Sequence, residues 1–430
     1  MEIDFKKYKK IHFLGIGGIG ISAIARMFLL EGKKVTGSDL ALSEVTDELV
    51  KLGVFVTEGQ DIKTIPKDSD LIVYSPALSE YAKDFLAKVK GFGIPMLSYP
   101  EVLHQISKEK YTIAVSGTHG KTTTTAMIAK VMADAKLDPT VIVGSLLKDT
   151  KSNFVAGKSE YFVVEACEYR RSFLQLQPTI LVITNIDADH LDYYKDLDDV
   201  VRAFGELVAQ VPKDGFVICN PSLPEIKSAI AKAVCQIVDY TKFQKRLKLK
   251  IPGKHNLENA AAALAVGNIL GLKGEVPEKS LEDFSGTWRR FEYRGKTTHG
   301  ASVYDDYGHH PTEITATLQG ARELFPTQKI VVVFQPHLYS RTKDHLSEWA
   351  TCFKLADHVV VLPIYPAREV DPGDITSEMV VEELDQSGQL AHLVKTFAEA
   401  AERASDLTVS GDVIITMGAG ETNKVADLLV

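Results

Sequence analysis

Residues 114–125 carry the clearest chemistry in the chain. They read Ala-Val-Ser-Gly-Thr-His-Gly-Lys-Thr-Thr-Thr-Thr, with an apolar segment at their start and helix-forming residues after them. A strand, a Gly-rich turn and a helix in this order make a phosphate-binding loop, whose backbone N–H groups and helix dipole attract anions. The stretch therefore predicts binding of ATP or a related nucleotide. The residues expected to contact it are Gly117, Thr118, His119, Gly120, Lys121, Thr122 and Thr123.

Two side chains of this loop have the types that phosphate chemistry needs. Lys121 would neutralise the β- and γ-phosphates, and the Thr122 hydroxyl would bind Mg²⁺. Only two residues separate Gly117 from Gly120, whereas about four separate the glycines of the common loop, so this is a shortened variant. A Gly-rich turn without a ligand is the alternative. The run of threonines is better explained at a helix N-terminus, where hydroxyls can meet metal, phosphate or N–H groups.

Polar residues follow two apolar segments, 161–164 and 180–183, which we expect to be strands. The first segment is followed by Glu165-Ala-Cys-Glu, and the second by a polar run that ends in His190. In a parallel α/β sheet such positions line the crevice where ligands bind. Glu165 is the expected Mg²⁺ partner and His190 could hold a second metal, for which Mn²⁺ is an alternative because Mg²⁺ prefers oxygen. A surface or N-cap acid and a hydrogen-bonded loop histidine are the structural alternatives.

The N-terminal part of the chain has the outline of a dinucleotide-binding unit. A strand near residues 9–14 opens a helix through a Gly-rich turn, and a second strand at 35–39 ends in an acid. Further expected strands at 71–74 and 95–98 make residues 1–107 one Rossmann-like domain. The Gly pattern alone is a weak signal. The candidate ligand-binding residues of this domain are Gly15, Gly17, Gly18, Gly20, Asp39 and Ser75.

The remaining sequence repeats this architecture. A length of 430 residues suggests three α/β domains, which we place at 1–107, 108–292 and 293–430. The third domain has expected strands at residues 302–305, 330–334, 358–362 and 413–416, separated by helical stretches as in a doubly wound sheet. Polar residues again follow its strands. They include Asp306, Tyr307, His309, His337 and Arg341.

Composition excludes several classes of protein. The net charge is −8 and the pI is near 5.9, which argues against nucleic acid or an anionic membrane as the main partner. No stretch of about 18 residues is uninterruptedly apolar, and the first residues lack the apolar segment of a signal peptide. The four cysteines are far apart and form no CxxC pair, so we expect reduced thiols, a cytoplasmic location and no zinc site.

The motifs taken together resemble those of the Mur ligase family, which builds the stem peptide of peptidoglycan. The resemblance covers essentially the whole chain, in order. Its motifs are residues 15–20, 117–122, 184–185 with Asp189, His190 and Asp192, 253–256 with Asn259, 289–291, 305–311 and 334–337. The resemblance implies that the first domain binds the UDP end of a sugar nucleotide instead of NAD, that the middle domain holds ATP and Mg²⁺, and that the third domain brings in the amino acid.

The resemblance also implies further site residues. Asn256 would read adenine, Asp306 would lie near the ribose of the nucleotide, and Arg289 would belong to the same ATP site. Tyr307, His309, His337 and Arg341 would bind the amino acid. The implied metal ligands are Thr122, Glu165 and His190.

The implied reaction has two steps. The lactyl carboxylate of a muramyl substrate attacks the γ-phosphate of ATP to give an acyl phosphate, and an amine then displaces phosphate. Lys121, with metal at Glu165 and His190, would offset the repulsion between the two anions. His309 is a candidate base for the amine, with water or phosphate as the alternative. Arg341 would hold the carboxylate of the amino acid.

Some positions distinguish branches of the family. Alanine-adding members have acids where this chain has Cys167 and Arg170, and often an arginine where it has Leu338. Relatives that add later residues carry a carbamylated lysine where this chain has Phe204 and Gly205. The resemblance therefore favours the branch that joins L-alanine to UDP-N-acetylmuramate, or the related branch that recycles whole tripeptides.

Three other classes compete with this interpretation. A dehydrogenase function would explain only the first domain and would give Lys121 of the phosphate-binding loop no role. A GTPase is disfavoured because residues 184–187 lack the Asn-Lys-x-Asp pattern that reads guanine. A catalytically silent UDP-sugar-binding protein on the same fold is the third. Both a monomer and a homodimer are compatible with the sequence.

Overall fold

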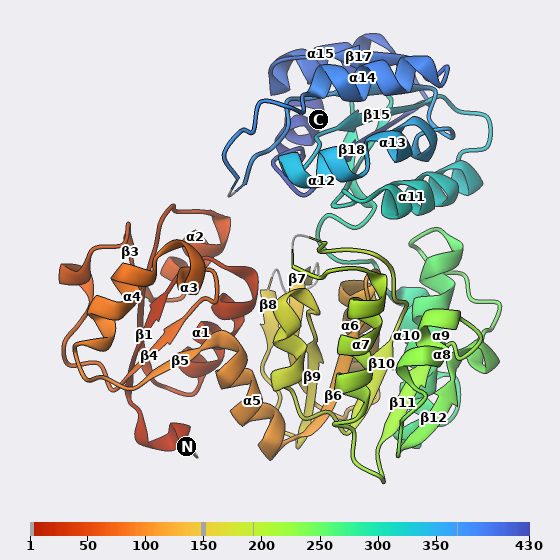
Figure 1. Cartoon of the computed structure of the whole chain (residues 1–430). Helices are drawn as coiled ribbons and strands as arrows, with labels where there is room; N and C mark the ends of the chain where they lie inside the picture. The colour runs from red at the N-terminus through yellow and green to blue at the C-terminus, as the bar shows by residue number, and fades with distance from the viewer. Residues whose placement is uncertain (1–3, 148–151, 192, 368) are drawn as a thin grey trace. The chain divides into compact units, whose positions relative to one another are not determined.

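The computed structural model describes residues 4–147, 152–191, 193–367 and 369–430. Its strands form three separate sheets flanked by helices, one in each α/β domain (Figure 1). The chain divides into two compact units, the first made of Met1–Leu247 with Glu258–Glu282 and the second of Lys248–Leu257 with Asp283–Val430. The first two sheets belong to the first unit and the third sheet to the second unit. No helix among the described residues is long and apolar enough to cross a membrane.

The first sheet is fully parallel, with the strand order β3-β2-β1-β4-β5. Its strands are β1 (Lys10–Leu14), β2 (Lys34–Asp39), β3 (Phe55–Glu58), β4 (Leu71–Tyr74) and β5 (Met96–Ser98). Its helices are α1 (Ile19–Leu30), α2 (Glu44–Lys51), α3 (Leu78–Tyr81), α4 (Lys83–Lys90) and α5 (Tyr99–Glu109), with short 3₁₀ helices at Phe5–Lys7 and Ile62–Thr64. The expected Rossmann-like pattern of strands is confirmed.

The second sheet has the order β12-β11-β10-β6-β9-β7-β8, and only β8 runs antiparallel to its neighbour. Its strands are β6 (Tyr111–Ser116), β7 (Thr140–Leu147), β8 (Ser152–Val155), β9 (Tyr161–Glu165), β10 (Ile180–Ile183), β11 (Phe216–Cys219) and β12 (Gln236–Asp239). The helices are α6 (Lys121–Asp134), α7 (Leu197–Val208), α8 (Pro224–Ala229), α9 (Lys254–Ile269) and α10 (Val276–Asp283), with 3₁₀ segments at Tyr169–Gln175 and Tyr240–Phe243. Four of these strands, β7, β8, β11 and β12, were not predicted from the sequence.

The third sheet has the order β13-β14-β18-β15-β16-β17, and only the edge strand β13 is antiparallel. Its strands are β13 (Glu292–Lys296), β14 (Ser302–Asp306), β15 (Ile330–Phe334), β16 (His358–Val361), β17 (Ala391–Leu393) and β18 (Val413–Met417). Its helices are α11 (Pro311–Leu324), α12 (Tyr339–Asp344), α13 (Leu346–Cys352), α14 (Ser377–Gln386), α15 (Phe397–Asp406) and α16 (Asn423–Leu429). All four strands predicted for this domain are present.

One hydrophobic core joins the first two sheets. It contains Phe13 of β1 and Phe28 of α1 together with Phe162 of β9, and none of the three is exposed. A polar contact adds to it, because the amide of Asn153 on β8 donates to the Ser22 hydroxyl on α1 at 2.8 Å. Burying apolar surface contributes roughly 25 cal/mol per Å², so a shared core makes the two sheets one compact unit.

The positions of β6, β9 and β10 fix where the chemistry of the second sheet occurs. β6 lies between β10 and β9 and is parallel to both. The carboxyl ends of the three strands therefore meet at one edge of the sheet, and the loops that follow them converge there. These are the loops in which the sequence analysis placed Lys121, Glu165 and His190.

His12, buried in the first sheet, makes stability depend on pH. Its Nδ1 lies 2.8 Å from the Thr36 hydroxyl, and its Nε2 has no hydrogen-bond partner among the described residues. Burial lowers the pKa of His12 to about 4, whereas the unfolded chain binds the proton near pH 6.5. Protonation therefore favours the unfolded state, and stability falls as the pH drops from about 6.5 toward 4.

Replacing His12 with leucine should remove this dependence. Between pH 7.5 and pH 5 the wild-type free energy of unfolding should fall by about 2 kcal/mol more than that of His12→Leu. Urea unfolding followed by circular dichroism at the two pH values measures the difference. His299→Leu, which replaces an exposed histidine, is the control and should behave as wild type. Equal pH dependence in wild type and His12→Leu would contradict the assignment.

Candidate active site

The residues after β6 make a tight turn into α6. Gly117 and Gly120 have φ angles of +134° and +83°. A Cβ on Gly117 would lie 2.0 Å from Thr184 Oγ1, and a Cβ on Gly120 would lie 2.7 Å from Asn259 Oδ1. Both positions therefore require glycine for conformation and for close approach. The turn leads into the N-terminus of α6, where first-turn N–H groups have no partner within the helix and attract anions.

Asn185, just after β10, supports this turn from the side. The Thr118 N–H donates to its backbone oxygen at 3.1 Å, and the His119 N–H donates to its Oδ1 at 2.8 Å. The Asn185 side-chain amide in turn donates to the His119 carbonyl at 3.0 Å. The amides of Thr118 and His119 thus brace the turn.

Lys121 begins α6 and forms a buried ion pair. Its ammonium donates to Glu168 Oε1 at 2.8 Å and to the carbonyls of Gly117 and Thr118 at 2.5 Å and 2.8 Å. Burial opposes the charge, but the attraction of Glu168 and the carboxylates around it outweighs burial and raises the pKa of Lys121. Lys121 is therefore charged at neutral pH. The loop therefore holds one buried cation beside the helix N-terminus.

The next two predicted ligands lie in contact. The Thr122 hydroxyl donates to Glu165 Oε1 at 3.1 Å, and the Gly144 N–H of β7 donates to Glu165 Oε2 at 2.7 Å. Thr122 and Thr123 are buried in the first turn of α6. A hydroxyl and a carboxylate side by side are oxygen donors of the kind that Mg²⁺ prefers.

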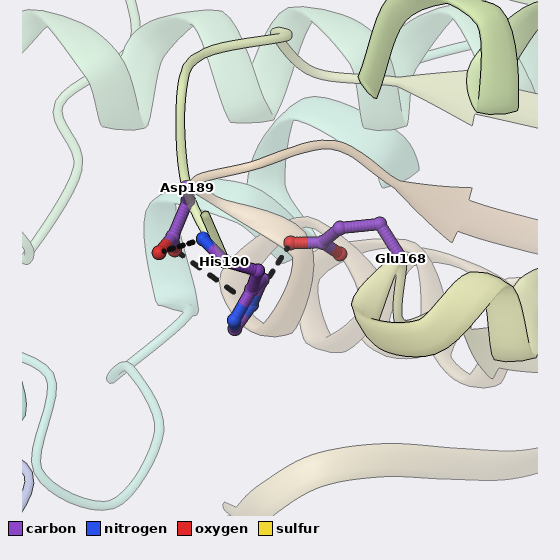
Figure 2. Close-up of side chains that lie close together, drawn as sticks. All are labelled: Glu168, Asp189 and His190. Carbon is purple, nitrogen blue, oxygen red and sulfur yellow. Dashed lines mark hydrogen bonds and ion pairs between the residues drawn. The ribbon is translucent and has the colours of Figure 1, made fainter. Parts of the chain in front are cut away.

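His190 belongs to a second group of ligands, shown in Figure 2. Its Nε2 lies 3.7 Å from Glu168 Oε1 and 3.7 Å from Asp189 Oδ2. One ligand atom of each of the three residues lies within 4.8 Å of the other two. The backbone of His190 has a positive φ of 57°, which is uncommon for a residue other than glycine, and its ring lies toward Glu168 (Figure 2). Two carboxylates and an imidazole suit Mn²⁺ or Mg²⁺.

The expected ligands Thr122, Glu165 and His190 therefore fall into two groups. Thr122 and Glu165 form one, and His190 forms the other with Glu168 and Asp189. The sequence analysis did not single out Glu168 and Asp189 as ligands. Only their positions could have indicated this role, since Glu168 follows the carboxyl end of β9 and Asp189 follows that of β10. Asp192, part of the motif after His190, lies outside the described residues.

The segment after β9 contains two of the residues that depart from the family pattern. Cys167 is exposed. Arg170 pairs with Glu80 of α3 and lies over the ring of Tyr169, 5.2 Å from its centroid. That tyrosine ring lies 4.7 Å from the His190 ring. The arginine thus has a partner of its own and leaves the negative charge of the Glu168 group in place.

The Gly-rich turn of the first domain gathers the predicted sugar-nucleotide residues at the ends of β1, β2 and β4. The Gly17 N–H donates to Asp39 Oδ2 at 2.7 Å, and a Cβ on Gly15 would lie 2.9 Å from Ser75 Cβ. Gly18 caps α1, and Gly20 lies in its first turn, where a Cβ would come within 2.7 Å of the Tyr99 ring. The turn brings backbone amides and a helix N-terminus together, the arrangement that binds a diphosphate.

In the second unit, aromatic and charged residues gather after β14 and β15. The ring centroids of His309 and His337 lie 5.5 Å apart, and Arg341 NH1 lies 3.4 Å from His337 Nδ1. His309 Nδ1 lies 3.0 Å from the Tyr307 carbonyl. When the ring donates from Nδ1, Nε2 carries the lone pair that a general base needs. The four predicted amino-acid-binding residues are therefore neighbours. Leu338, between them, has a positive φ of 67°.

The remaining predicted nucleotide residues of this unit are buried. Burial raises the pKa of Asp306 to about 6, although its carboxylate accepts the N–H groups of Phe291 at 2.8 Å and Gly308 at 2.7 Å. The Asn256 amide donates to the Pro252 carbonyl at 2.6 Å.

The guanidinium of Arg289 donates hydrogen bonds of 2.7 Å to Asp305, Gly418, Gly420 and Thr422. That guanidinium therefore ties the end of β14 to the loop after β18.

Known families match consecutive parts of the chain. The Mur ligase family catalytic domain matches residues 10–111, the Mur ligase middle domain matches residues 115–246, and the glutamate ligase domain of Mur ligases matches residues 289–420. Their order is the order of the three sheets.

Individual relatives match over the full length. A UDP-N-acetylmuramate–L-alanine ligase of Clostridium kluyveri is 40% identical over 100% of this chain and 99% of its own, and one of Caldanaerobacter subterraneus subsp. tengcongensis is 39% identical over 99% and 98%. A solved UDP-N-acetylmuramate-alanine ligase from Thermotoga maritima has a TM-score of 0.82 at 29% identity and covers 98% of both chains. A murein peptide ligase from Psychrobacter arcticus shares the fold, with a TM-score of 0.71 at 24% identity and 97% of both chains covered. The chain belongs to the Mur ligase family.

Proposed function

We propose that this protein joins L-alanine to the lactyl carboxylate of UDP-N-acetylmuramate, with conversion of ATP to ADP and phosphate. The observation that carries the proposal is the full-length identity of 40% to a relative with this name. The neighbourhood of Lys121 agrees with it, because a buried cation beside a helix N-terminus is suited to a γ-phosphate under attack by a carboxylate. The reaction passes through an acyl phosphate, and the alanine amine then attacks its acyl carbon and displaces phosphate.

The ATP site lies at the turn between β6 and α6. Lys121 meets the β- and γ-phosphates, and the first-turn amides of α6 bind their oxygens. Thr122 and Glu165 hold one divalent cation, Mg²⁺ or Mn²⁺, and His190 holds a second. A divalent cation bound there supplies positive charge to phosphate and carboxylate oxygens. The complete set proposed for ATP is Gly117, Thr118, His119, Gly120, Lys121, Thr122, Thr123, Asn256, Arg289 and Asp306.

The two other substrates bind in the outer domains. The UDP diphosphate lies on the Gly-rich turn that holds Gly15, Gly17, Gly18 and Gly20, with Asp39 and Ser75 beside it. Arg341 pairs with the alanine carboxylate, and His309 Nε2 takes the proton from the amine as it attacks. We retain the domain limits 1–107, 108–292 and 293–430. We also propose a cytoplasmic protein, because its substrates are nucleotides, and a monomer or homodimer.

A coupled assay of phosphate release from ATP tests this function. Release should require UDP-N-acetylmuramate and an amino acid together, and L-alanine should give the highest kcat/KM in a panel with glycine, L-serine and L-alanyl-γ-D-glutamyl-meso-diaminopimelate. Preference for the tripeptide would assign the chain to the recycling branch. Binding of UDP-N-acetylmuramate without phosphate release under any condition would identify a silent binding protein.

Asp39→Ala should raise the KM for UDP-N-acetylmuramate by about tenfold, because it removes a carboxylate that holds the Gly17 amide at the sugar-nucleotide turn. The KM for ATP should not change. Asp70→Ala is the matched control, since Asp70 also accepts backbone N–H groups in this domain, at Lys9 and Lys10. Steady-state kinetics with each substrate varied in turn measures both values. Tight NAD binding by the full chain would contradict the assignment of this turn to a UDP-sugar.

A further inference from the structure

One carboxylate oxygen of Glu168 lies between an ammonium and an imidazole. Glu168 Oε1 accepts from Lys121 at 2.8 Å and lies 3.7 Å from His190 Nε2, which is also 3.7 Å from Asp189 Oδ2 (Figure 2). The Glu168 side chain is only 2% exposed, and its Oε2 is buried without a hydrogen-bond partner among the described residues. A buried carboxylate oxygen without a donor is costly, so Lys121 alone does not satisfy this group.

The spacing of the three ligand atoms is close to that of a divalent-cation site. With metal–oxygen bonds of about 2.1 Å, ligand atoms lie about 3 Å apart at right angles and about 4.2 Å apart in line. The distances of 3.7 Å from His190 Nε2 to its two carboxylate neighbours fall between these values. Small side-chain rotations would therefore complete the coordination. A cation in this site would also compensate the buried carboxylate of Glu168, whichever of its two oxygens it binds.

Lys121 and such a cation compete for Glu168. A cation on Oε1 would share that oxygen with the ammonium 2.8 Å away, and their like charges would repel in a buried site. The nucleotide phosphates attract the same ammonium. Movement of Lys121 onto a phosphate therefore removes the cation's competitor and leaves Glu168 with an uncompensated charge.

We propose that Glu168 exchanges partners during the catalytic cycle. Without nucleotide it neutralises Lys121, and with nucleotide it binds a divalent cation together with Asp189 and His190. Nucleotide binding thereby creates the second cation site, and by linkage the cation strengthens nucleotide binding by the same factor. The exchange rests on the proposed contact of Lys121 with phosphate. The cation site itself can be tested in the absence of nucleotide and substrates.

Binding of Mn²⁺ to the full-length protein, measured by electron paramagnetic resonance without nucleotide, tests the site. Lys121→Met removes the competing charge and should bind Mn²⁺ at least tenfold more tightly than wild type. Adding Glu168→Gln to Lys121→Met should abolish the gain. The double variant Lys121→Met/Glu160→Gln, which neutralises an exposed acid outside the group, should retain it. An unchanged Mn²⁺ affinity in Lys121→Met, or a gain that survives Glu168→Gln, would overturn the proposal.

A second measurement does not depend on the stability of the Lys121 variants. In the presence of a non-hydrolysable ATP analogue, wild type should bind two Mn²⁺ per chain and Glu168→Gln only one. Equal numbers in the two proteins would contradict the exchange. These readouts involve no ligation, so an inactive protein that still gains the Mn²⁺ site in Lys121→Met would refute the proposed function and leave the site intact.

Discussion

Lys121→Ala should lower the rate of phosphate release by a factor of about a thousand or more. In the proposed reaction the γ-phosphoryl group carries negative charge while a carboxylate attacks it, and we propose that Lys121, at the N-terminus of α6, is the cation that offsets this charge. Removal of one preorganised donor from a site of this kind costs roughly 10²–10³ in kcat, and removal of a full charge should cost more. Phosphate release by the purified variant measures the effect. Near-normal turnover would contradict the role of Lys121.

The structure adds a control to this experiment. The Lys121→Ala variant would also leave Glu168 buried without its partner. Breaking a buried ion pair from one side costs about 3–5 kcal/mol. The double variant Lys121→Ala/Glu168→Gln carries no such charge and should recover stability in thermal unfolding. It should remain inactive, which separates a loss of catalysis from a loss of folded protein.

Arg341→Ala should raise the KM for L-alanine by roughly thirtyfold or more. A guanidinium pairs with a carboxylate through two hydrogen bonds, and loss of a buried charge-assisted pair costs on the order of 2–5 kcal/mol. Position 338 holds a buried leucine and cannot replace the charge. The KM for ATP should change little. Arg341→Lys should restore only part of the affinity, because an ammonium lacks the planar fork.

Lys343→Ala provides the matched control on the same helix. Lys343 lies two residues further along α12, where its ammonium pairs with Asp374 at 2.5 Å on the exposed surface. The variant removes one positive charge from α12 without touching the His337 neighbourhood. Its KM for L-alanine should equal that of wild type. An increase in the ATP KM of Arg341→Ala, with no change for alanine, would place Arg341 in the nucleotide site instead.

The fold follows from local sequence where apolar runs and turn residues agree. The strands at 71–74, 180–183 and 330–334 match the structure residue for residue. The hairpin of β7 and β8 was missed because β8 pairs antiparallel at the edge of an otherwise parallel sheet. Antiparallel strands need no crossover helix between them, so the alternation of strands and helices that indicated the other strands is absent here. The shared core of the first unit could not be predicted from the sequence, because burial of α1 against the second sheet depends on contacts between residues that are distant in sequence.

The sequence predicted which residues belong to the candidate site better than it predicted which of them pair with one another. Residue type and position after a strand were enough to select Lys121, Glu165 and His190. Pairing of Lys121 with Glu168 depends on a three-dimensional approach of residues 47 positions apart, which spacing cannot reveal. Arg289 illustrates the converse. Its motif indicates a ligand contact, while in the structure its donors bond within the third domain and hold the end of β14.

Transfer of oxygen from the sugar substrate to phosphate tests the central claim most directly. UDP-N-acetylmuramate labelled with ¹⁸O at both oxygens of the lactyl carboxylate is incubated with the protein, ATP and L-alanine, and the released phosphate is analysed by mass spectrometry. Attack of the carboxylate on the γ-phosphate forms a P–O bond, and the amine later breaks the C–O bond of the acyl phosphate, so each phosphate should carry one ¹⁸O and the new amide the other. Product formation with unlabelled phosphate would contradict an acyl phosphate, and the absence of any amide product would contradict ligation itself.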